Sequence, residues 1–174
     1  PEDPAKGYPE SEMQRTLPKT YSYFKQFEDQ LRKRSGFKQF FDPETAPFYS
    51  VYNVGSYTFC PFKVVWREQA ALLTAAVAIS EDGQKPIVPD HKLMLSPGVS
   101  KDEVHYICAL LNSIPAQFIV KGYGIETSIS SHIFKYLSID RFDSKNDSHR
   151  SLAANSQTLH EATTEADTAK LALL

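Results

Sequence analysis

Apolar residues recur at helical spacing near the N-terminus. Phe24, Phe27 and Leu31 lie three and four positions apart, and Gly36 can supply a left-handed stop. This pattern predicts a helix over residues 21–34.

The centre of the chain has the composition of β-strands. Residues 48–66 are mostly β-branched or aromatic, with breaks at Gly55 and Pro61, and they predict strand, turn and strand. Residues 72–79 form a further apolar run closed by a turn. Residues 91–95 then predict another short strand.

Helical signals return after the strands. Ser100 and Glu103 have the spacing of a capping box, and the apolar residues behind them predict a helix that ends near Asn112. A second short helix is predicted to begin at Pro115, because proline suits the first turn. A third is predicted over residues 129–137.

The last segment, residues 147–174, is rich in residues that favour helices but carries only a thin apolar stripe through Leu152 and Leu159. Such a helix buries too little surface by itself. We therefore expect a helix that needs a partner, or a frayed tail. Truncation after Asp143 is then expected to leave the melting temperature of the core nearly unchanged.

The order of elements predicts an α+β fold. We expect a small twisted sheet, mixed or antiparallel, packed with several short helices and followed by a C-terminal helix. Residues 1–18 are expected to be a linker from an upstream region, residues 19–142 a single domain, and residues 143–174 the C-terminal helix or tail.

Composition narrows the class of protein. The 174 residues include 19 basic and 21 acidic side chains, and the net charge of −2 arises from acidic ends around a middle segment, residues 19–138, of +2. No apolar stretch is long enough for a membrane span and no signal peptide is evident, so we expect a soluble, cytoplasmic protein. Cys60 and Cys108 lie far apart and are expected to be core thiols.

The sequence lacks the residue patterns that several kinds of catalytic or nucleotide-binding site require. The seven glycines are too scattered for a phosphate loop, and no nucleophile elbow is present. A metal-dependent nuclease built on Asp90 would need a lysine two residues after Glu103, where the sequence has His105, so Asp90 is interpreted as a turn carboxylate. His132 beside Ser130 is interpreted as part of a polar helix start.

A basic and aromatic constellation remains, and it suits binding. Its cations lie in or beside strand ends and loops, where they can reach phosphates or guanine edges, although ordinary surface charge is the alternative interpretation. The cations are Lys63, Arg67, Lys85, His91, Lys92 and Lys121.

Several segments together resemble the C-terminal target-recognition domain of TaqI-like DNA adenine-N6 methyltransferases, including those fused to restriction nucleases. They span residues 18 to about 142. The segments are PKTYSY at 18–23, PFY at 47–49, YTFCPFKVVW at 57–66, VPDHKLM at 88–94, YICALLNS at 106–113 and IETSISSHI at 125–133.

The resemblance implies a domain that clamps and reads double-stranded DNA beside a separate catalytic domain. That catalytic domain would bind S-adenosylmethionine and flip the adenine. This chain has no Asn-Pro-Pro-Tyr motif and no glycine-bearing cofactor motif, so no catalytic site or cofactor is expected within it. The DNA-binding residues that it implies are Lys63, His91, Lys92, Lys121, Tyr123, Thr127, Ser128 and Ser130. Arg67 of the basic constellation is predicted to join them.

Two function classes stay open at this point. One is a sequence-specific DNA recognition domain of a methyltransferase or a type II restriction-modification enzyme. The other is a protein interaction module, or a lobe like that of type I specificity subunits, which are similar in layout and place a long spacer helix after a recognition lobe.

Overall fold

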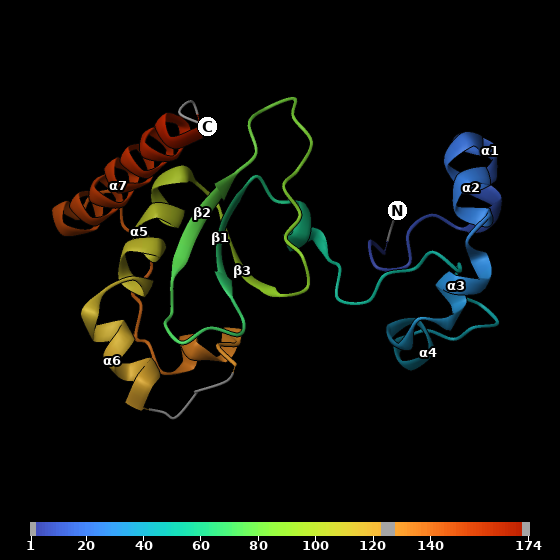
Figure 1. The fold of residues 1–174 in the computed structure, drawn as a ribbon, viewed down its shortest axis with the longest axis horizontal. Coiled ribbons are helices and arrows are strands. Elements are labelled where there is room, and N and C mark those ends of the chain that lie inside the picture. The colour runs from blue at the N-terminus through green and yellow to red at the C-terminus, as the bar shows by residue number, and fades with distance from the viewer. Residues whose placement is uncertain (1–2, 123–127, 172–174) are drawn as a thin grey trace. The chain divides into compact units, whose positions relative to one another are not determined.

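The computed structural model describes residues 3–122 and 128–171, with side chains as far as residue 164 (Figure 1). Two compact units divide the chain, Pro1–Thr58 and Phe59–Leu174. The division falls inside the predicted domain 19–142. The segment expected to be a linker contains a helix and contributes the buried side chain of Met13 to the first unit.

The first unit consists of four short helices, α1 (Glu10–Thr16), α2 (Pro18–Lys25), α3 (Glu28–Lys33) and α4 (Ser35–Phe40). The prediction of one helix over residues 21–34 is therefore wrong. The chain turns at Phe27, whose amide N–H donates to the carbonyl of Phe24 at 2.9 Å. The ring of Phe27 packs edge-on against Tyr23 with 5.3 Å between centroids.

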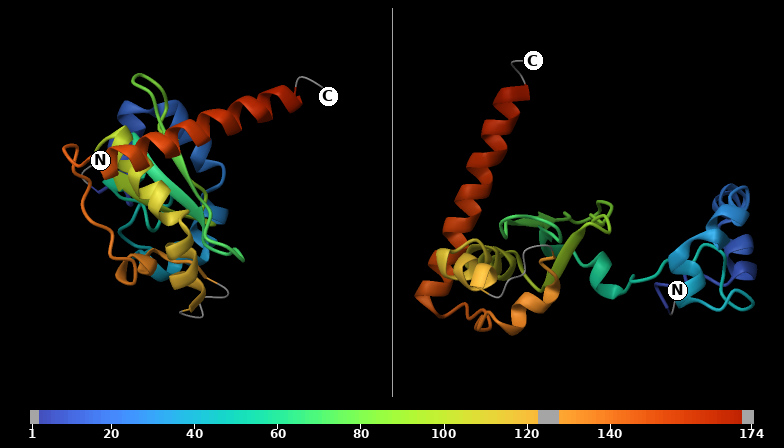
Figure 2. Two further views of the ribbon diagram at one scale, coloured as in Figure 1. Left: turned by 90° about the vertical axis from the view of Figure 1, so that its left-hand side faces the viewer. Right: turned by 60° about the horizontal axis from the view of Figure 1, so that its bottom comes forward.

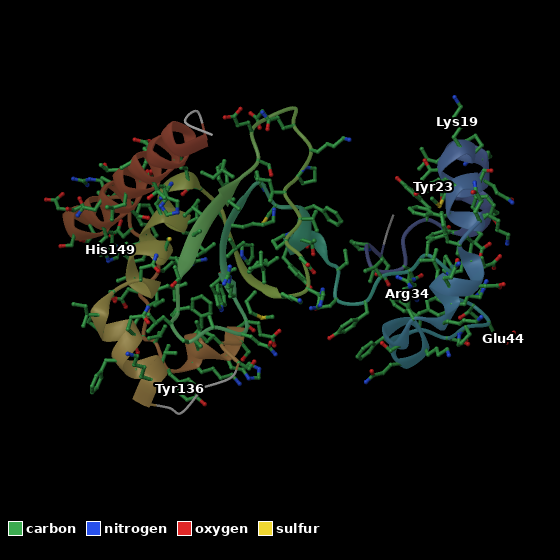
Figure 3. All side chains as sticks on the ribbon, viewed as in Figure 1. Lys19, Tyr23, Arg34, Glu44, Tyr136 and His149 are labelled. Atoms are coloured by element: carbon green, nitrogen blue, oxygen red, sulfur yellow. The ribbon has the colours of Figure 1, made fainter. Side chains whose placement is uncertain are left out.

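No strand forms over residues 48–54, in contrast to the prediction. The guanidinium of Arg34, labelled in Figure 3, donates from Nη2 to the carbonyls of Phe48 at 3.0 Å and Ser50 at 2.8 Å. Its Nε donates to the carbonyl of Leu31 at 2.8 Å. Backbone acceptors that a sheet would pair are thus taken by one side chain, and a turn, η1 (Ser56–Phe59), follows.

The second unit is built on a three-stranded antiparallel sheet in the order β2-β1-β3. Its strands are β1 (Phe62–Arg67), β2 (Ala75–Ile79) and β3 (Leu93–Gly98). Val64 lies opposite Val77 on one side and Ser96 on the other. The predicted apolar runs at 72–79 and 91–95 supply β2 and the start of β3.

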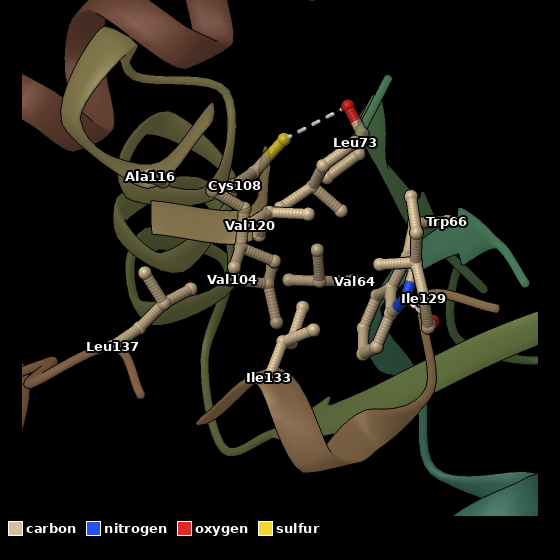
Figure 4. Packing of buried hydrophobic residues seen from close by; sticks show 12 residues of the cluster. Val64, Trp66, Leu73, Val104, Cys108, Ala116, Val120, Ile129, Ile133 and Leu137 are labelled. Carbon is tan, nitrogen blue, oxygen red and sulfur yellow. Dashed lines mark hydrogen bonds between the residues drawn. The ribbon is translucent and has the colours of Figure 1, made fainter. Parts of the chain in front are cut away.

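Helices cover one face of this sheet: α5 (Lys101–Leu111), α6 (Ile114–Gly122) and the short turn η2 (Ser131–Lys135). Ser100 caps α5, since its Oγ accepts the Glu103 N–H at 3.2 Å, as the capping box predicts. Figure 4 shows the resulting core, in which Val64 and Trp66 of β1 meet Val104 and Cys108 of α5. The α+β prediction is confirmed.

The C-terminal helix, α7 (Asp147–Leu171), packs along α5 within the same unit (Figures 1 and 2). The α7 residues buried at this contact, Ala153 and Ser156, are small, and the rings of His149 and His160 meet Tyr106 and His105 of α5 beside them. In the predicted stripe, Leu159 is 68% exposed. Helix α7 thus finds its partner inside this chain. Among the described residues, no helix is long and apolar enough to cross a membrane.

Candidate nucleic-acid interface

Three segments that carry predicted site residues converge at one end of the sheet, and Glu68 joins them. The Glu68 N–H donates to the carbonyl of Lys92 at 3.0 Å, and its carbonyl accepts the Ile129 N–H at 2.6 Å. The Ser128 hydroxyl donates to Glu68 Oε1 at 3.2 Å. The end of β1, the turn before β3 and the segment from residue 128 are therefore joined by hydrogen bonds into one corner.

A hollow of about 460 Å³ lies at this corner. Four of the side chains that line it are exposed and carry hydrogen-bonding or charged groups suited to a polar ligand. The lining residues are Arg67, Glu68, Gln69, His91, Lys92 and Leu93.

Residues behind the hollow hold its wall in place. The indole Nε1 of Trp66 donates to the carbonyl of Ile129 at 2.7 Å, and this hydrogen bond is buried. The Trp66 ring also packs edge-on against Phe134, with 5.7 Å between centroids. Ser130 caps η2, because its Oγ accepts the His132 N–H at 3.4 Å, which agrees with the polar helix start predicted there.

Asp90 anchors the turn that presents His91 and Lys92. Its carbonyl accepts the Leu93 N–H at 2.9 Å, and its carboxylate pairs with Nδ1 of His91. Desolvation raises the pKa of Asp90, but the hydrogen bonds and charge of His91 outweigh it, so the pKa lies below its ordinary value of 3.8. Asp90 is thus a turn residue, and no group of three metal-binding side chains occurs within the described residues.

Lys63 does not belong to this interface, which corrects the sequence prediction. Its side chain is fully buried, with 0% exposure, and its ammonium donates to the carbonyl of Cys60. The residue sits between Ala78 and Pro97 in the middle of the sheet. A group so enclosed cannot reach a phosphate.

The remaining predicted residues have different positions. Lys121 is exposed near the end of α6, and Lys85 is exposed in the segment after β2, and neither lines the hollow. Tyr123 and Thr127 lie outside the described residues. The structure thus brings together Arg67, His91, Lys92 and, through Glu68, Ser128.

Glu68 and Gln69 were not predicted as site residues. The available signal was position, since both directly follow a strand that ends at the predicted residue Arg67. What makes Glu68 central is its hydrogen bonding to segments far along the chain, and no local pattern shows that.

A larger hollow of about 1070 Å³ lies in the first unit, but the side chains that line it are less suited to binding an anion. Its arginine, Arg32, already donates from Nε to Glu28 at 3.0 Å and from Nη1 to the carbonyl of Pro43 at 3.1 Å. Acidic groups dominate its lining, which includes Asp3, Glu10, Glu12 and Glu44. The corner at the end of β1 is therefore the better candidate for an anionic ligand.

No family model matches the chain, and no curated protein or solved structure matches it either.

Proposed function

We propose that this chain is a sequence-specific double-stranded DNA recognition domain of a site-specific DNA adenine-N6 methyltransferase or restriction-modification enzyme. The observation that carries the proposal is the convergence of Arg67, His91 and Lys92 on one hollow at the braced end of the sheet. His91 and Lys92 also lie within a segment of the resemblance found in the sequence, and Arg67 directly follows another.

In this proposal, different side chains of the hollow contact different parts of the DNA. Arg67 offers a planar fork of donors that suits the O6 and N7 acceptors of guanine, whereas Lys92 offers a point charge that suits a phosphate. Gln69 can pair with adenine through one donor and one acceptor. Base reading needs side chains on a fixed support, and the hydrogen bonds of Glu68 supply it.

Methyl transfer belongs to a partner in this proposal. A catalytic domain in the same or another chain would hold S-adenosylmethionine and the flipped adenine, while this chain supplies contacts to the duplex. Calorimetry on the 174 residues should accordingly detect no saturable S-adenosylmethionine binding. Saturable binding would contradict this division of labour.

Substitution of the hollow's cations tests the proposal. Arg67→Ala and Lys92→Ala should each weaken duplex binding, and loss of a phosphate contact should reduce the salt slope by roughly one phosphate's share. If Arg67 reads a base, its loss should reach about 1 to 3 kcal/mol at one position of the recognised sequence.

Lys101→Ala and Lys145→Ala are the matched controls, because both residues are exposed cations that do not line the hollow. Both controls should leave duplex affinity and salt slope unchanged. Equal, small effects from all four substitutions would show that the hollow is ordinary charged surface.

A protein interaction module is the second candidate, and α6 favours it. Ile114 and Phe118 lie one turn apart on this helix and are 85% and 78% exposed. Exposed apolar side chains in such a pair are typical of docking surfaces. Under this alternative the chain would show no duplex binding that falls with salt, and Phe118→Ala would weaken binding to a protein partner.

A further inference from the structure

Helix α7 is fastened to the edge of the sheet by a histidine that accepts a backbone hydrogen bond. The N–H of Val77 points away from β1 and donates to Nε2 of His160 at 3.0 Å. β2 is an edge strand of this sheet. His160 therefore pairs a backbone donor that the sheet itself leaves open.

The two ring nitrogens of His160 have fixed roles. Nδ1 lies 2.9 Å from the carbonyl of Ser156, one turn earlier in α7, and a carbonyl can only accept. Nδ1 must therefore carry the hydrogen, which leaves Nε2 with the lone pair that accepts the Val77 N–H. Only the neutral imidazole satisfies both contacts.

A second histidine sits against the first. His105 of α5 is buried, and its ring meets the His160 ring edge-on with 5.2 Å between centroids. Its Nδ1 lies 3.2 Å from the Ser156 hydroxyl. Burial, then the neighbouring His160 and Lys101, lower the pKa of His105 below its ordinary 6.5, against smaller opposing effects of Asp102 and Glu161. The His105 ring at this contact thus favours the neutral form.

We propose that the seating of α7 on β2 is proton-linked. A proton added to Nε2 of His160 occupies the lone pair and places an N–H donor against the N–H of Val77, which breaks the contact. When this turn of α7 is released, water can accept hydrogen bonds from both the His160 ring and the Val77 N–H.

A hollow of about 560 Å³ adjoins the contact between His160 and Val77 and opens it to solvent and to charged side chains. Glu81 after β2, Lys101 of α5 and Glu161 of α7 line it together with both histidines. The two carboxylates favour an imidazolium once it forms, whereas Lys101 and His105 oppose it. Asp102 of α5 adds a further negative charge near His105.

The direction of the pH dependence follows from which state binds the proton. The seated state requires neutral histidine, and the released state has an ordinary histidine pKa of about 6.5. Seating is therefore strongest above that pH and weakens as pH falls below it. Between about pH 7.5 and about pH 5.5, one such group shifts the equilibrium toward release by about tenfold.

Hydrogen exchange on the full chain tests the proposal, with protection factors corrected for the intrinsic pH dependence of exchange. The Val77 amide should lose about tenfold protection between the two pH values, while Val65 in the central strand should keep its protection. In NMR titrations, the Val77 amide nitrogen shift and the His160 ring should share one midpoint.

Two variants complete the design. His160→Gln offers a non-titrating acceptor and should make Val77 protection independent of pH, whereas His132→Gln, which removes an exposed histidine, should behave as wild type. The proposal fails if wild-type Val77 protection does not change with pH, or if His160→Gln shows the wild-type loss. Different midpoints for the ring and the amide would overturn it equally.

Discussion

Lys63 and Arg67 lie four residues apart in β1, so their side chains point to the same face of the strand, yet one is buried and the other is exposed. Lys63 is enclosed and donates to the carbonyl of Cys60, whereas Arg67 at the strand's end is exposed and lines the hollow. Their roles differ accordingly. Lys63 stabilises the sheet and Arg67 is available to a ligand.

Substitutions of Lys63 should separate packing from charge. Lys63→Ala removes a buried stem and should cost about 2 to 4 kcal/mol in urea denaturation. Lys63→Met keeps most of that volume and should cost clearly less. Folded Lys63→Met should retain wild-type duplex affinity, and reduced affinity with unchanged stability would return Lys63 to the interface.

At Gly98, the last residue of β3, the surrounding side chains leave no room for a Cβ atom. A Cβ there would overlap Cγ1 of the fully buried Val104 and lie 3.3 Å from Oε2 of Glu103. Gly98→Ala should therefore lower the free energy of unfolding by about 1 to 3 kcal/mol. Gly122→Ala is the control, because no atom of the described residues beyond its chain neighbours and its own helix backbone lies within 4 Å of its added Cβ; equal effects from both changes would contradict the steric explanation.

At this scale the sequence identifies residue types well and their burial poorly. Arg67, His91 and Lys92 were predicted for the site from their position at strand ends, and the structure brings them together. Lys63 had the same local signals. Its burial depends on the turn at Cys60 and on two neighbouring strands, none of which a local pattern specifies.

At the scale of elements, side chains from two helices protect the edge of β2. Asn112 at the end of α5 accepts the Ala75 N–H at 2.9 Å and donates to the Ala75 carbonyl at 2.8 Å, as a neighbouring strand would. His160 of α7 accepts the next outward N–H, that of Val77. Helices α5 and α7 thus complete the sheet as well as covering it.

Truncation after Asp143 should therefore destabilise the second unit, contrary to what the sequence suggests. It removes the buried side chains of Ala153 and Ser156 and uncovers His105. We expect the melting temperature to fall by more than a few degrees. Leu159→Ala, at an exposed position of the same helix, should leave it nearly unchanged, and an unchanged truncation variant would show that α7 is dispensable for the fold.

Sequence patterns predicted elements best where local signals and tertiary contacts agree. The cap at Ser100 and the apolar face behind it correctly predicted α5, and the apolar run before residue 80 correctly predicted β2. The strand expected near residue 50 failed because Arg34 takes its carbonyls. The partner of α7 was missed because α7 contacts α5 through alanine, serine and histidine, which carry little hydrophobic signal.

At the scale of the whole molecule, the candidate interface lies entirely within the unit Phe59–Leu174. The chain has a net charge of −2, so overall attraction to DNA is weak. Under the proposed function, DNA binding therefore depends on the few cations gathered at the hollow. This predicts a modest salt slope, about 0.9 for each phosphate contacted, together with a clear preference for sequence.

Selection from a pool of randomised duplexes by the full chain tests the DNA-recognition proposal most directly. We predict enrichment of one short sequence, whose binding weakens with salt and is lost from the selection when Arg67 is replaced by alanine. Absence of any enriched sequence, with retention of duplexes independent of salt concentration, would contradict the proposed function.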